Sequence, residues 1–367
     1  MRRFKLIAGM VALFFCFSCK QKIMPSEDEL DSKKTYDIII NQPDSIQTPK
    51  GMQWVQGKTF IKGAKVGDAY AMDREKPAHK VIVDGFFMDK TEVTNSEFEE
   101  FVTATGYVTV AERPINWEEM KKDLPQGTRK PVDSLLLPGS LVFNRNISGR
   151  PDMSNYGNWW TWKIGANWRH PQGPNSSIQG KEEYPVVHIA YEDALAYCAW
   201  KKRRLPTEAE WEAAAQGNFT HTIYTWGNDP EQLKDHANTW QGEFPIKSTT
   251  RDGFEYLAPV KSYPPNSIGL YDLLGNVWEW TSDIYNPMYY KNLEGDQPIV
   301  NPAGATEYYN PQNPFQEEMI IKGGSYLCHA SYCASYRISA RMSTSRDSGS
   351  DHVGFRTVVT PAMIVQQ

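Results

Sequence analysis

Two cysteines in the last part of the chain, Cys328 and Cys333, are the residues whose type and spacing most directly suggest chemistry. They form a Cys-x4-Cys pair that follows Gly323 and Gly324, and two adjacent glycines permit a tight turn or a close approach of the backbone. Two thiolates that are the only protein ligands of a metal favour monovalent copper, which prefers sulfur and accepts low coordination numbers. The pair therefore predicts a copper-thiolate centre with a catalytic role.

Two other interpretations of the cysteine pair stay open at this level. In an exported protein the pair could form a structural disulfide. A zinc site would need four ligands, commonly with CxxC spacing, and only Cys198 and scattered histidines remain to complete one. The disulfide is the stronger of these alternatives.

The first 18 residues predict a signal peptide that does not belong to the fold. Three basic residues precede an apolar stretch, residues 6–17, which is too short to span a membrane. Ser18-Cys19 resembles the lipobox of bacterial lipoproteins, in which the cysteine is lipidated, although Cys16 stands where that motif usually has Leu. An ordinary cleaved signal or an uncleaved anchor is the alternative. We expect an exported bacterial lipoprotein, anchored to a membrane through Cys19 at the periplasm or the cell surface.

Residues 19–50 have the composition of a flexible, lipidated tether, because they are polar, locally acidic and poor in aromatic side chains. Residues 51–361 contain no linker and predict one domain. That domain is rich in large rings and turn residues, since the chain has 12 Trp, 19 Tyr, 15 Phe, 26 Gly and 24 Pro. A net charge of −5 gives no basic surface for nucleic acid.

Four segments of this domain predict regular structure. Residues 80–88 alternate apolar and polar side chains as a half-buried strand does. Residues 94–103 predict a short helix with two phenylalanines on one face, and residues 191–200 predict a second helix. A third helix should begin after Thr207, because Glu210 stands three residues later and completes a capping box. Turns and short strands are expected elsewhere.

Several sequence strings together resemble the formylglycine-generating enzyme family, also called sulfatase-modifying factors, from about residue 51 to residue 357. The strings are GANWRHPQGP at 165–174, KKRRLPTEAEWE at 201–212, HANTWQGEFP at 236–245, GLYDLLGNVWEWTSD at 269–283, KGGSYLCHASYC at 322–333 and VGFR at 353–356. The RLPTEAEWE and GNVWEW strings are shared by a wider superfamily and indicate fold only, whereas the paired cysteines are more specific. The resemblance implies an α+β fold, an irregular variant of the C-type lectin fold with little regular secondary structure.

The resemblance further implies a copper-dependent enzyme that uses O2 to oxidise a sulfatase. Its substrate would be an unfolded or partly folded sulfatase, whose cysteine in a Cys-x-Pro-x-Arg segment becomes Cα-formylglycine. Cys328 and Cys333 would hold copper(I), and the substrate cysteine would join as a third thiolate. O2 is then activated, a hydrogen leaves the substrate Cβ, and the resulting thioaldehyde hydrolyses to the aldehyde. Ser325 and His329 match family positions near the reacting atoms, where they could donate a hydrogen bond or move a proton, or only satisfy the loop backbone.

Two structural calcium sites are also implied by the resemblance, and loop oxygen atoms alone can build such sites. The first would use Asn238 and Asp252 with the backbone carbonyls of Thr239 and Phe254. The second would use Asp272 and Glu279 with the backbone carbonyls of Gly275 and Val277. Relatives carry Asn where this chain has Asp272, and Asp is at least as good an oxygen donor. The alternative is that these carboxylates only cap turns or accept buried hydrogen bonds.

Cys198 is predicted to be a free, buried thiol. Vertebrate relatives pair the matching cysteine with a second one near the C-terminus, but this chain has Thr357 at that position. Free cysteine is commonly buried as a small apolar side chain.

Other functional classes compete with the enzyme. A non-catalytic lipoprotein on the same scaffold, in gliding or secretion machinery or in carbohydrate binding, would be expected to lose the cysteine pair that this chain keeps. An iron-dependent sulfoxide synthase would need an additional helical domain, for which the residues before Gly51 leave no room.

Overall fold

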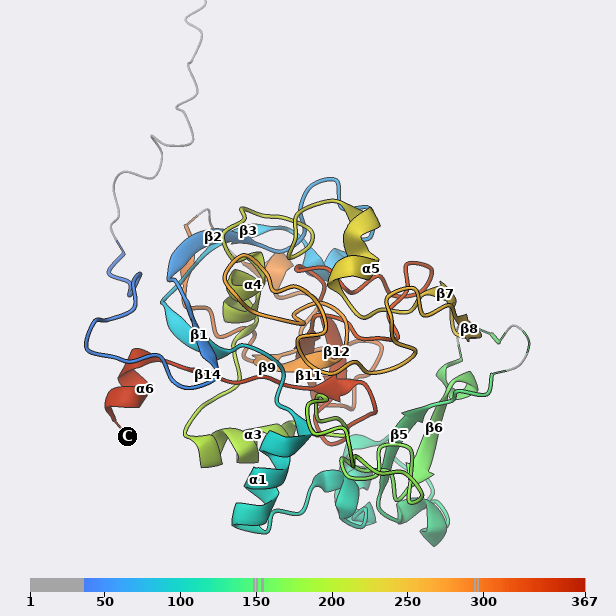
Figure 1. Cartoon of the computed structure of the whole chain (residues 1–367). Helices are drawn as coiled ribbons and strands as arrows, with labels where there is room; N and C mark the ends of the chain where they lie inside the picture. Colours follow the sequence, from blue (N-terminus) through green and yellow to red (C-terminus); the bar gives the residue numbers. More distant parts are fainter. Residues whose placement is uncertain are drawn as a thin grey trace, which may run out of the picture. The chain divides into compact units, whose positions relative to one another are not determined.

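The computed structural model describes residues 36–366 except Ser148, Arg150, Met153, Ser154, Glu294 and Asp296. The predicted signal peptide and the lipidation site at Cys19 therefore lie outside the described residues. A compact unit begins at Ile38 and contains the rest of the described chain (Figure 1). It begins within the segment that the sequence assigned to the tether, and Ile46 of that segment is buried.

The helices of this unit are short, and its strands form several small sheets. The α-helices of the described residues are α1 (Asn95–Thr105), α2 (Trp117–Met120), α3 (Tyr191–Lys201), α4 (Glu208–Gln216), α5 (Leu233–His236) and α6 (Pro361–Val365). The strands are β1 (Met52–Val55), β2 (Lys58–Lys62), β3 (His79–Val83), β4 (Phe86–Asp89), β5 (Gly139–Phe143), β6 (Trp160–Ile164), β7 (Gly242–Glu243), β8 (Lys247–Ser248), β9 (Trp278–Ile284), β10 (Ile299–Val300), β11 (Glu318–Lys322), β12 (Met342–Ser345), β13 (Val353–Gly354) and β14 (Val358–Val359). The expected irregular α+β architecture is confirmed.

A four-stranded sheet with the order β12-β11-β9-β13 lies near the centre of the unit (Figure 1). In it β11 runs antiparallel to both β9 and β12, and β13 runs parallel to β9. Three-stranded sheets β1-β4-β14 and β10-β3-β2 and the hairpin β5-β6 complete the framework that matters here. The cysteine loop connects β11 to β12, so the central sheet holds both of its ends.

The single strand predicted over residues 80–88 is wrong, because the segment is divided between β3 and β4 at Asp84 and Gly85. The two halves belong to different sheets: β3 pairs with β2, and β4 pairs with β1 and β14. Asp84 Oδ1 accepts a hydrogen bond from the Ile39 N–H at 2.7 Å. A Cβ atom at Gly85 would lie 2.2 Å from the ring of Trp54, so close packing requires glycine at the break.

The predicted helix ends are confirmed where a side chain caps them. The hydroxyl of Thr94 accepts from the Glu97 N–H, and the Glu97 carboxylate accepts from the Thr94 N–H, so α1 begins with a complete capping box. Thr207 and Glu210 form the same arrangement at the start of α4. Helix α3 also forms, but Leu195, which shares the apolar spacing of this helix, is 40 % exposed.

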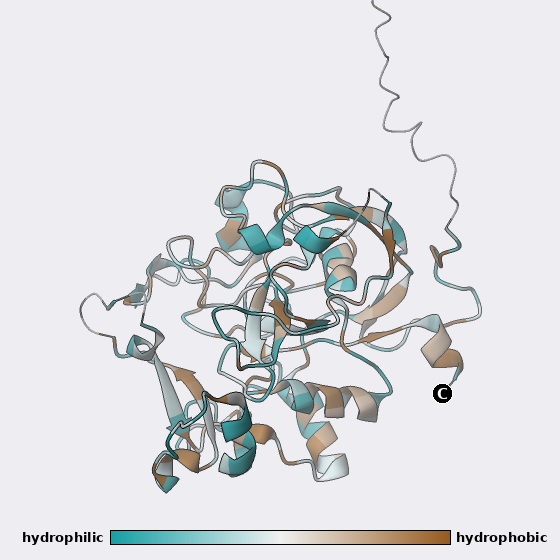
Figure 2. Cartoon of the chain, turned by 180° about the vertical axis from the view of Figure 1, so that it is seen from behind, coloured by the Kyte–Doolittle hydropathy of each residue, from teal (hydrophilic) through white to brown (hydrophobic). Residues whose placement is uncertain are grey.

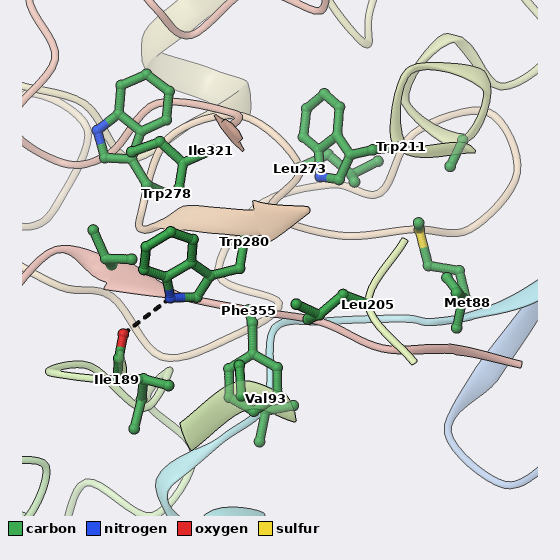
Figure 3. Close-up of a cluster of buried hydrophobic side chains, with 14 of the residues drawn as sticks. Met88, Val93, Ile189, Leu205, Trp211, Leu273, Trp278, Trp280, Ile321 and Phe355 are labelled. Atoms are coloured by element: carbon green, nitrogen blue, oxygen red, sulfur yellow. Dashed lines mark hydrogen bonds between the residues drawn. The ribbon is translucent and has the colours of Figure 1, made fainter. Parts of the chain in front are cut away.

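Aromatic side chains fill the interior, as the composition predicted. Trp211 from α4 and Trp278 and Trp280 from β9 lie among the buried residues in Figure 3. The indole N–H of Trp280 donates to the backbone oxygen of Ile189 at 2.9 Å, which satisfies a polar group inside the core. Figure 2 shows that much of the surrounding loop trace is hydrophilic. In the part of the chain that the structure describes, no helix combines the length and the apolarity needed to cross a membrane.

A buried network of ion pairs fixes α4 to the sheets on either side. Lys62 Nζ of β2 lies 2.8 Å from Glu208, and Lys322 Nζ of β11 lies 2.9 Å from Glu212. Arg341 Nε, next to β12, lies 2.9 Å from Glu208. Because each charge has a partner, the network holds α4 and β11 in a defined relation just before the cysteine loop begins.

Candidate active site

The two cysteines of the Cys-x4-Cys pair face each other within the loop between β11 and β12. Their Sγ atoms are 2.7 Å apart, and the two thiols are free rather than joined in a disulfide. Cys328 is buried, whereas Cys333 is partly exposed. The chain thus places two sulfur atoms side by side, one on a buried residue and one on a partly exposed residue.

Gly323 and Gly324 bring the loop into this position, as the sequence suggested. Their φ angles are +90° and +77°, which side chains rarely permit. A Cβ atom at Gly323 would lie 2.6 Å from the backbone oxygen of Leu273, and one at Gly324 would lie 3.0 Å from the backbone between Ser335 and Tyr336. The glycines are required because Gly323 packs against the backbone of a separate segment at Leu273, and Gly324 packs against the returning part of the loop at Ser335 and Tyr336.

The turn that returns Cys333 to Cys328 is held by one carbonyl. The backbone oxygen of His329 accepts from the N–H groups of Tyr332, Cys333 and Ala334, at 3.0, 2.9 and 3.1 Å. The spacing of four residues between the cysteines corresponds to this one turn.

The two thiols differ in acidity. Burial raises the pKa of Cys328 well above its ordinary value. The hydrogen bond with the Cys328 thiol lowers the pKa of Cys333, and backbone N–H groups add to this effect. The first thiolate therefore forms on Cys333, the less buried residue of the two. Two adjacent sulfur ligands, one readily ionised, fit a soft ion of low coordination number such as copper(I).

Ser325 and His329 lie on the same loop, as the sequence placed them. The Ser325 N–H donates to Cys328 Sγ at 3.4 Å, and its hydroxyl accepts from the Leu327 N–H at 3.3 Å. The Ser331 N–H donates to His329 Nδ1 at 3.2 Å, so the neutral ring carries its proton on Nε2. Burial lowers the pKa of His329, which keeps the ring neutral at pH 7 and makes Nε2 a hydrogen-bond donor.

An aromatic cluster flanks the cysteine loop. It is built from side chains of the loop, of β5 and its hairpin, and of the residues on either side of β7. Its buried members are Phe143, Trp159, Trp240, Phe244, Tyr326 and Leu327. Tyr332, between the two cysteines in sequence, packs against it with its ring centroid 5.6 Å from that of Trp159. The cluster gives this side of the loop an apolar wall.

The residues assigned to the first calcium site are brought together. Asp252 joins the two segments, because its Oδ2 accepts from the Thr239 N–H at 3.0 Å and its Oδ1 from the Phe254 N–H at 3.3 Å. Asn238 donates to the backbone oxygen of Tyr256 at 2.8 Å. A turn-capping role accounts for these hydrogen bonds, and the cluster of amide, carboxylate and carbonyl groups also suits a hard cation.

The residues assigned to the second site lie on the adjoining loop. Asp272 has a φ angle of +55°, and its Oδ2 accepts from the Lys261 N–H at 2.7 Å. Glu279 is fully buried, and both of its oxygens accept from Arg356 at 2.7 Å. Trp211 Nε1 donates to the same carboxylate at 2.8 Å. Gly275, with Val277 on the same loop, lies so close to Asn238 that a Cβ atom would be 2.3 Å from its backbone oxygen.

Glu92, which the sequence did not single out, adds a third buried carboxyl group to this second site. It is fully buried, its Oε1 accepts from Asn276 Nδ2 at 3.0 Å, and its Oε2 has no hydrogen-bond partner. Arg356 is the guanidinium beside Glu92, Asp272 and Glu279, so among the described residues these three buried carboxyl groups share one buried positive charge. The exposed Lys261 also acts on Asp272. Burial raises the pKa of Asp272 to about 6 and that of Glu92 well above its usual range. This imbalance and the unpartnered oxygen fit a bound cation.

Such a cation would take most of its ligands from the backbone. Among the described residues, no three His, Cys, Asp or Glu side chains converge in the way a metal site built from side chains requires. Backbone carbonyls of the loop would therefore complete the coordination. Glu92 and Arg356 carry no local sequence signal for this role, because their partners are distant in the chain.

Cys198 is free and 2 % exposed, so the prediction of a buried thiol is confirmed. Thr357 donates its hydroxyl to Asp89 at 2.5 Å in place of a bridge.

Comparisons with known proteins find relatives over most of the chain. Residues 40–361 match the Sulfatase-modifying factor enzyme 1-like domain. The chain is 41 % identical to the mouse formylglycine-generating enzyme over 77 % of this chain and 68 % of that protein. It is 38 % identical to the formylglycine-generating enzyme of Thermomonospora curvata over 92 % of this chain and all of that protein. A mouse protein named inactive Cα-formylglycine-generating enzyme 2 is 37 % identical over 83 % of this chain and 84 % of its own length.

The fold also has a solved relative. The structure of PvdO from Pseudomonas aeruginosa superposes with a TM-score of 0.56 at 21 % identity and covers 87 % of this chain and 99 % of PvdO. At this identity the likeness concerns the fold alone.

Proposed function

The chain belongs to the sulfatase-modifying factor enzyme family, and from this premise we propose that it converts the active-site cysteine of a sulfatase to Cα-formylglycine. The observation that carries the proposal is the pair of free, adjacent thiols on the loop between β11 and β12. The relatives of the chain that are named formylglycine-generating enzymes support it. Because a cysteine side chain must lose its sulfur and gain an aldehyde oxygen, an oxidant is required, and we propose O2.

Cys328 and Cys333 would hold copper(I), which supplies one-electron chemistry with O2 when bound. The lowered pKa of Cys333 favours a thiolate ligand on this member of the pair. The aromatic cluster gives a substrate segment an apolar wall and limits the access of water and of competing thiols. The protonated Nε2 of His329 can donate a hydrogen bond toward a substrate sulfur or oxygen, which makes His329 a positioning candidate.

A peptide assay tests the role of the two cysteines. The copper-loaded protein would be incubated with O2 and a peptide that contains Cys-x-Pro-x-Arg, and mass spectrometry would follow aldehyde formation. Cys328→Ser and Cys333→Ser should each abolish turnover, because either substitution removes half of the sulfur ligands. Cys198→Ala is the matched control and should retain most activity. Turnover by either serine variant would refute the dithiolate centre.

A non-catalytic role on the same scaffold is the second candidate, since one relative is named inactive. The same assay decides between the two functions. Failure of copper-loaded wild-type protein to oxidise any Cys-x-Pro-x-Arg peptide, while it still binds the peptide, would favour the non-catalytic role.

Calcium in the two loop sites is proposed as a structural cofactor. Removal of calcium should lower the melting temperature, and added calcium should restore it, because an ion that binds only the folded state stabilises it. Asp252→Ala and Asp272→Ala are better probes than Glu279→Ala, since Glu279 also pairs with Arg356. These variants should lose the calcium response and keep copper binding. A melting temperature that ignores calcium in metal-stripped wild type would contradict the proposal.

Attachment to a membrane through a lipid on Cys19 is proposed from the sequence. Mass spectrometry of the mature protein should find a lipidated N-terminal cysteine, and Cys19→Ala should release the protein from membranes. A mature N-terminus elsewhere would overturn this part and leave the enzyme assignment intact.

A further inference from the structure

A cavity of about 250 Å³ lies beside the aromatic cluster but outside the cysteine loop. Tyr256 and Leu257 line it and also pack against the aromatic cluster, so the two features adjoin. Trp168 and Tyr184 add further rings to the lining. The cavity is larger than the engineered apolar cavities of ~150 Å³ that take up a benzene molecule, so its size permits a ligand and not only a single water.

Asp351 is the carboxylate of this cavity, and it is only 1 % exposed. Its Oδ2 accepts from the Phe143 N–H at 3.1 Å and from Gln172 Nε2 at 3.3 Å. Its Oδ1 is buried and accepts no hydrogen bond of good geometry, although the nearby Tyr326 hydroxyl helps to lower the pKa of the carboxyl group. A buried carboxylate oxygen without a donor is costly, and the cost is relieved when a charged donor fills the space in front of it.

The other charged residues around the cavity do not donate a hydrogen bond to Asp351 Oδ1. Arg145 and Lys181 are exposed at the rim, where the Arg145 guanidinium lies 3.4 Å above the ring of Tyr256. Glu255, also exposed, offsets one of these cations. His352 Nδ1 is 3.9 Å from Asp351 Oδ1, beyond hydrogen-bond distance. Arg145 acts on the Asp351 carboxyl group from the rim and lowers its pKa, but burial has the larger effect and raises it.

We propose that this cavity binds a guanidinium or ammonium group, with Asp351 as its anionic partner and the aromatic rings as its walls. Planar cations stack favourably on aromatic faces, and a guanidinium offers the paired N–H donors that a carboxylate accepts. The cation belongs either to a small free molecule or to a basic side chain of a bound peptide. The inference goes beyond the oxidation chemistry, because neither cysteine takes part.

Three probes of one shape test the charge preference in the wild-type protein. Calorimetric titration with benzamidine, benzamide and benzoate compares a cation, a neutral molecule and an anion. Benzamidine should bind at least about tenfold more tightly than either of the others, because only it supplies charged donors to Asp351. Equal binding of benzamide, or tighter binding of benzoate, would overturn the proposal, as would the absence of benzamidine binding.

Variants locate the binding site. Asp351→Asn keeps an oxygen for the Phe143 N–H but removes the charge, and it should weaken benzamidine binding about tenfold or more. Glu255→Gln, which changes the rim carboxylate, is the matched control and should bind as the wild type does. Loss of binding in the control alone would place the cation at the rim and contradict the proposal. If Asp351→Asn does not fold, the ranking of the three probes in the wild type still decides.

A peptide comparison separates the two sources of the cation. An arginine peptide that binds more tightly than its citrulline counterpart, and competes with benzamidine, would identify a peptide side chain as the ligand. Binding of agmatine without any difference between the two peptides would identify a free small molecule. Copper and O2 are absent from these titrations, so their outcome is independent of whether the protein oxidises a sulfatase.

Discussion

Replacement of Arg356 by methionine tests how the excess of buried carboxylates is held. Arg356 is fully buried and donates to both oxygens of Glu279 at 2.7 Å. It also donates to the backbone oxygen of Tyr271 at 2.9 Å and to that of Asp89 at 3.2 Å. In metal-free protein, Arg356→Met would leave Glu92, Asp272 and Glu279 without their shared cation.

The size of the effect follows from this count of charges. Breaking a buried ion pair by removing one partner costs about 3–5 kcal/mol, and Arg356→Met should lie at the upper end because it exposes three carboxylates to one another. Glu279→Gln should cost less, about 2–3 kcal/mol, because Glu92 and Asp272 still face the guanidinium. The double variant should cost less than the sum of the two, since it removes both partners of the pair.

Urea unfolding of the four proteins in metal-free buffer measures these differences in the free energy of unfolding. Calcium should then restore more stability to Arg356→Met than to the wild type, because a cation would replace the lost guanidinium. A cost below about 1 kcal/mol for Arg356→Met, or a larger cost for Glu279→Gln, would refute the shared-cation argument. Additive costs in the double variant would show that the pair does not act as a unit.

Three further predictions concern other parts of the site. Gly324→Ala should destabilise the protein by about 1–3 kcal/mol and weaken copper binding, because the φ angle is +77° and a Cβ atom would lie 3.0 Å from the backbone. Gly106→Ala is the control: its φ angle is +67° but the space around it is open, so only the backbone strain should appear. Equal copper affinity of the two variants would contradict the packing argument. Burial raises the pKa of Asp351 to about 6, whereas the same carboxyl group in the unfolded chain loses its proton near pH 4. The free energy of unfolding that this group contributes therefore falls as the pH rises from 4 to 6. Asp351→Asn should abolish that part of the fall, about 3 kcal/mol, and an unchanged pH profile of urea unfolding would refute the raised pKa. Cys198→Ala should lower the free energy of unfolding, measured in urea, by about 1 kcal/mol. Cys198 in the native protein should resist alkylation because burial raises the pKa of its thiol, and rapid alkylation would contradict this.

Features of the chain that depend on near neighbours could be predicted from the sequence. Thr94 and Thr207 begin helices because each contacts a glutamate three residues later, and the chain itself sets that separation. The meeting of Cys328 and Cys333 is equally local, because one turn after Gly323 and Gly324 returns the chain on itself. A dozen consecutive residues are therefore enough to predict that the two thiols meet.

The strand over residues 80–88 shows where local patterns stop. Its alternation of apolar and polar residues is real, but the backbone of Ile39 and the ring of Trp54 contact the chain at Asp84 and Gly85 and divide it between two sheets. The residue pattern within the segment gives no information about those distant neighbours. Tertiary contacts therefore decided the boundary.

The charge environment of the candidate sites was decided by the tertiary structure alone. Glu92 and Arg356 are separated by most of the domain, yet they share one buried cluster with Glu279. Asp351 is likewise an ordinary loop residue in the sequence, and only folding buries its carboxylate against β5 and places the residue in the lining of a cavity. Residue type fixes which charges a chain carries, but their pKa values and partners depend on burial and on neighbours that the fold brings from distant positions.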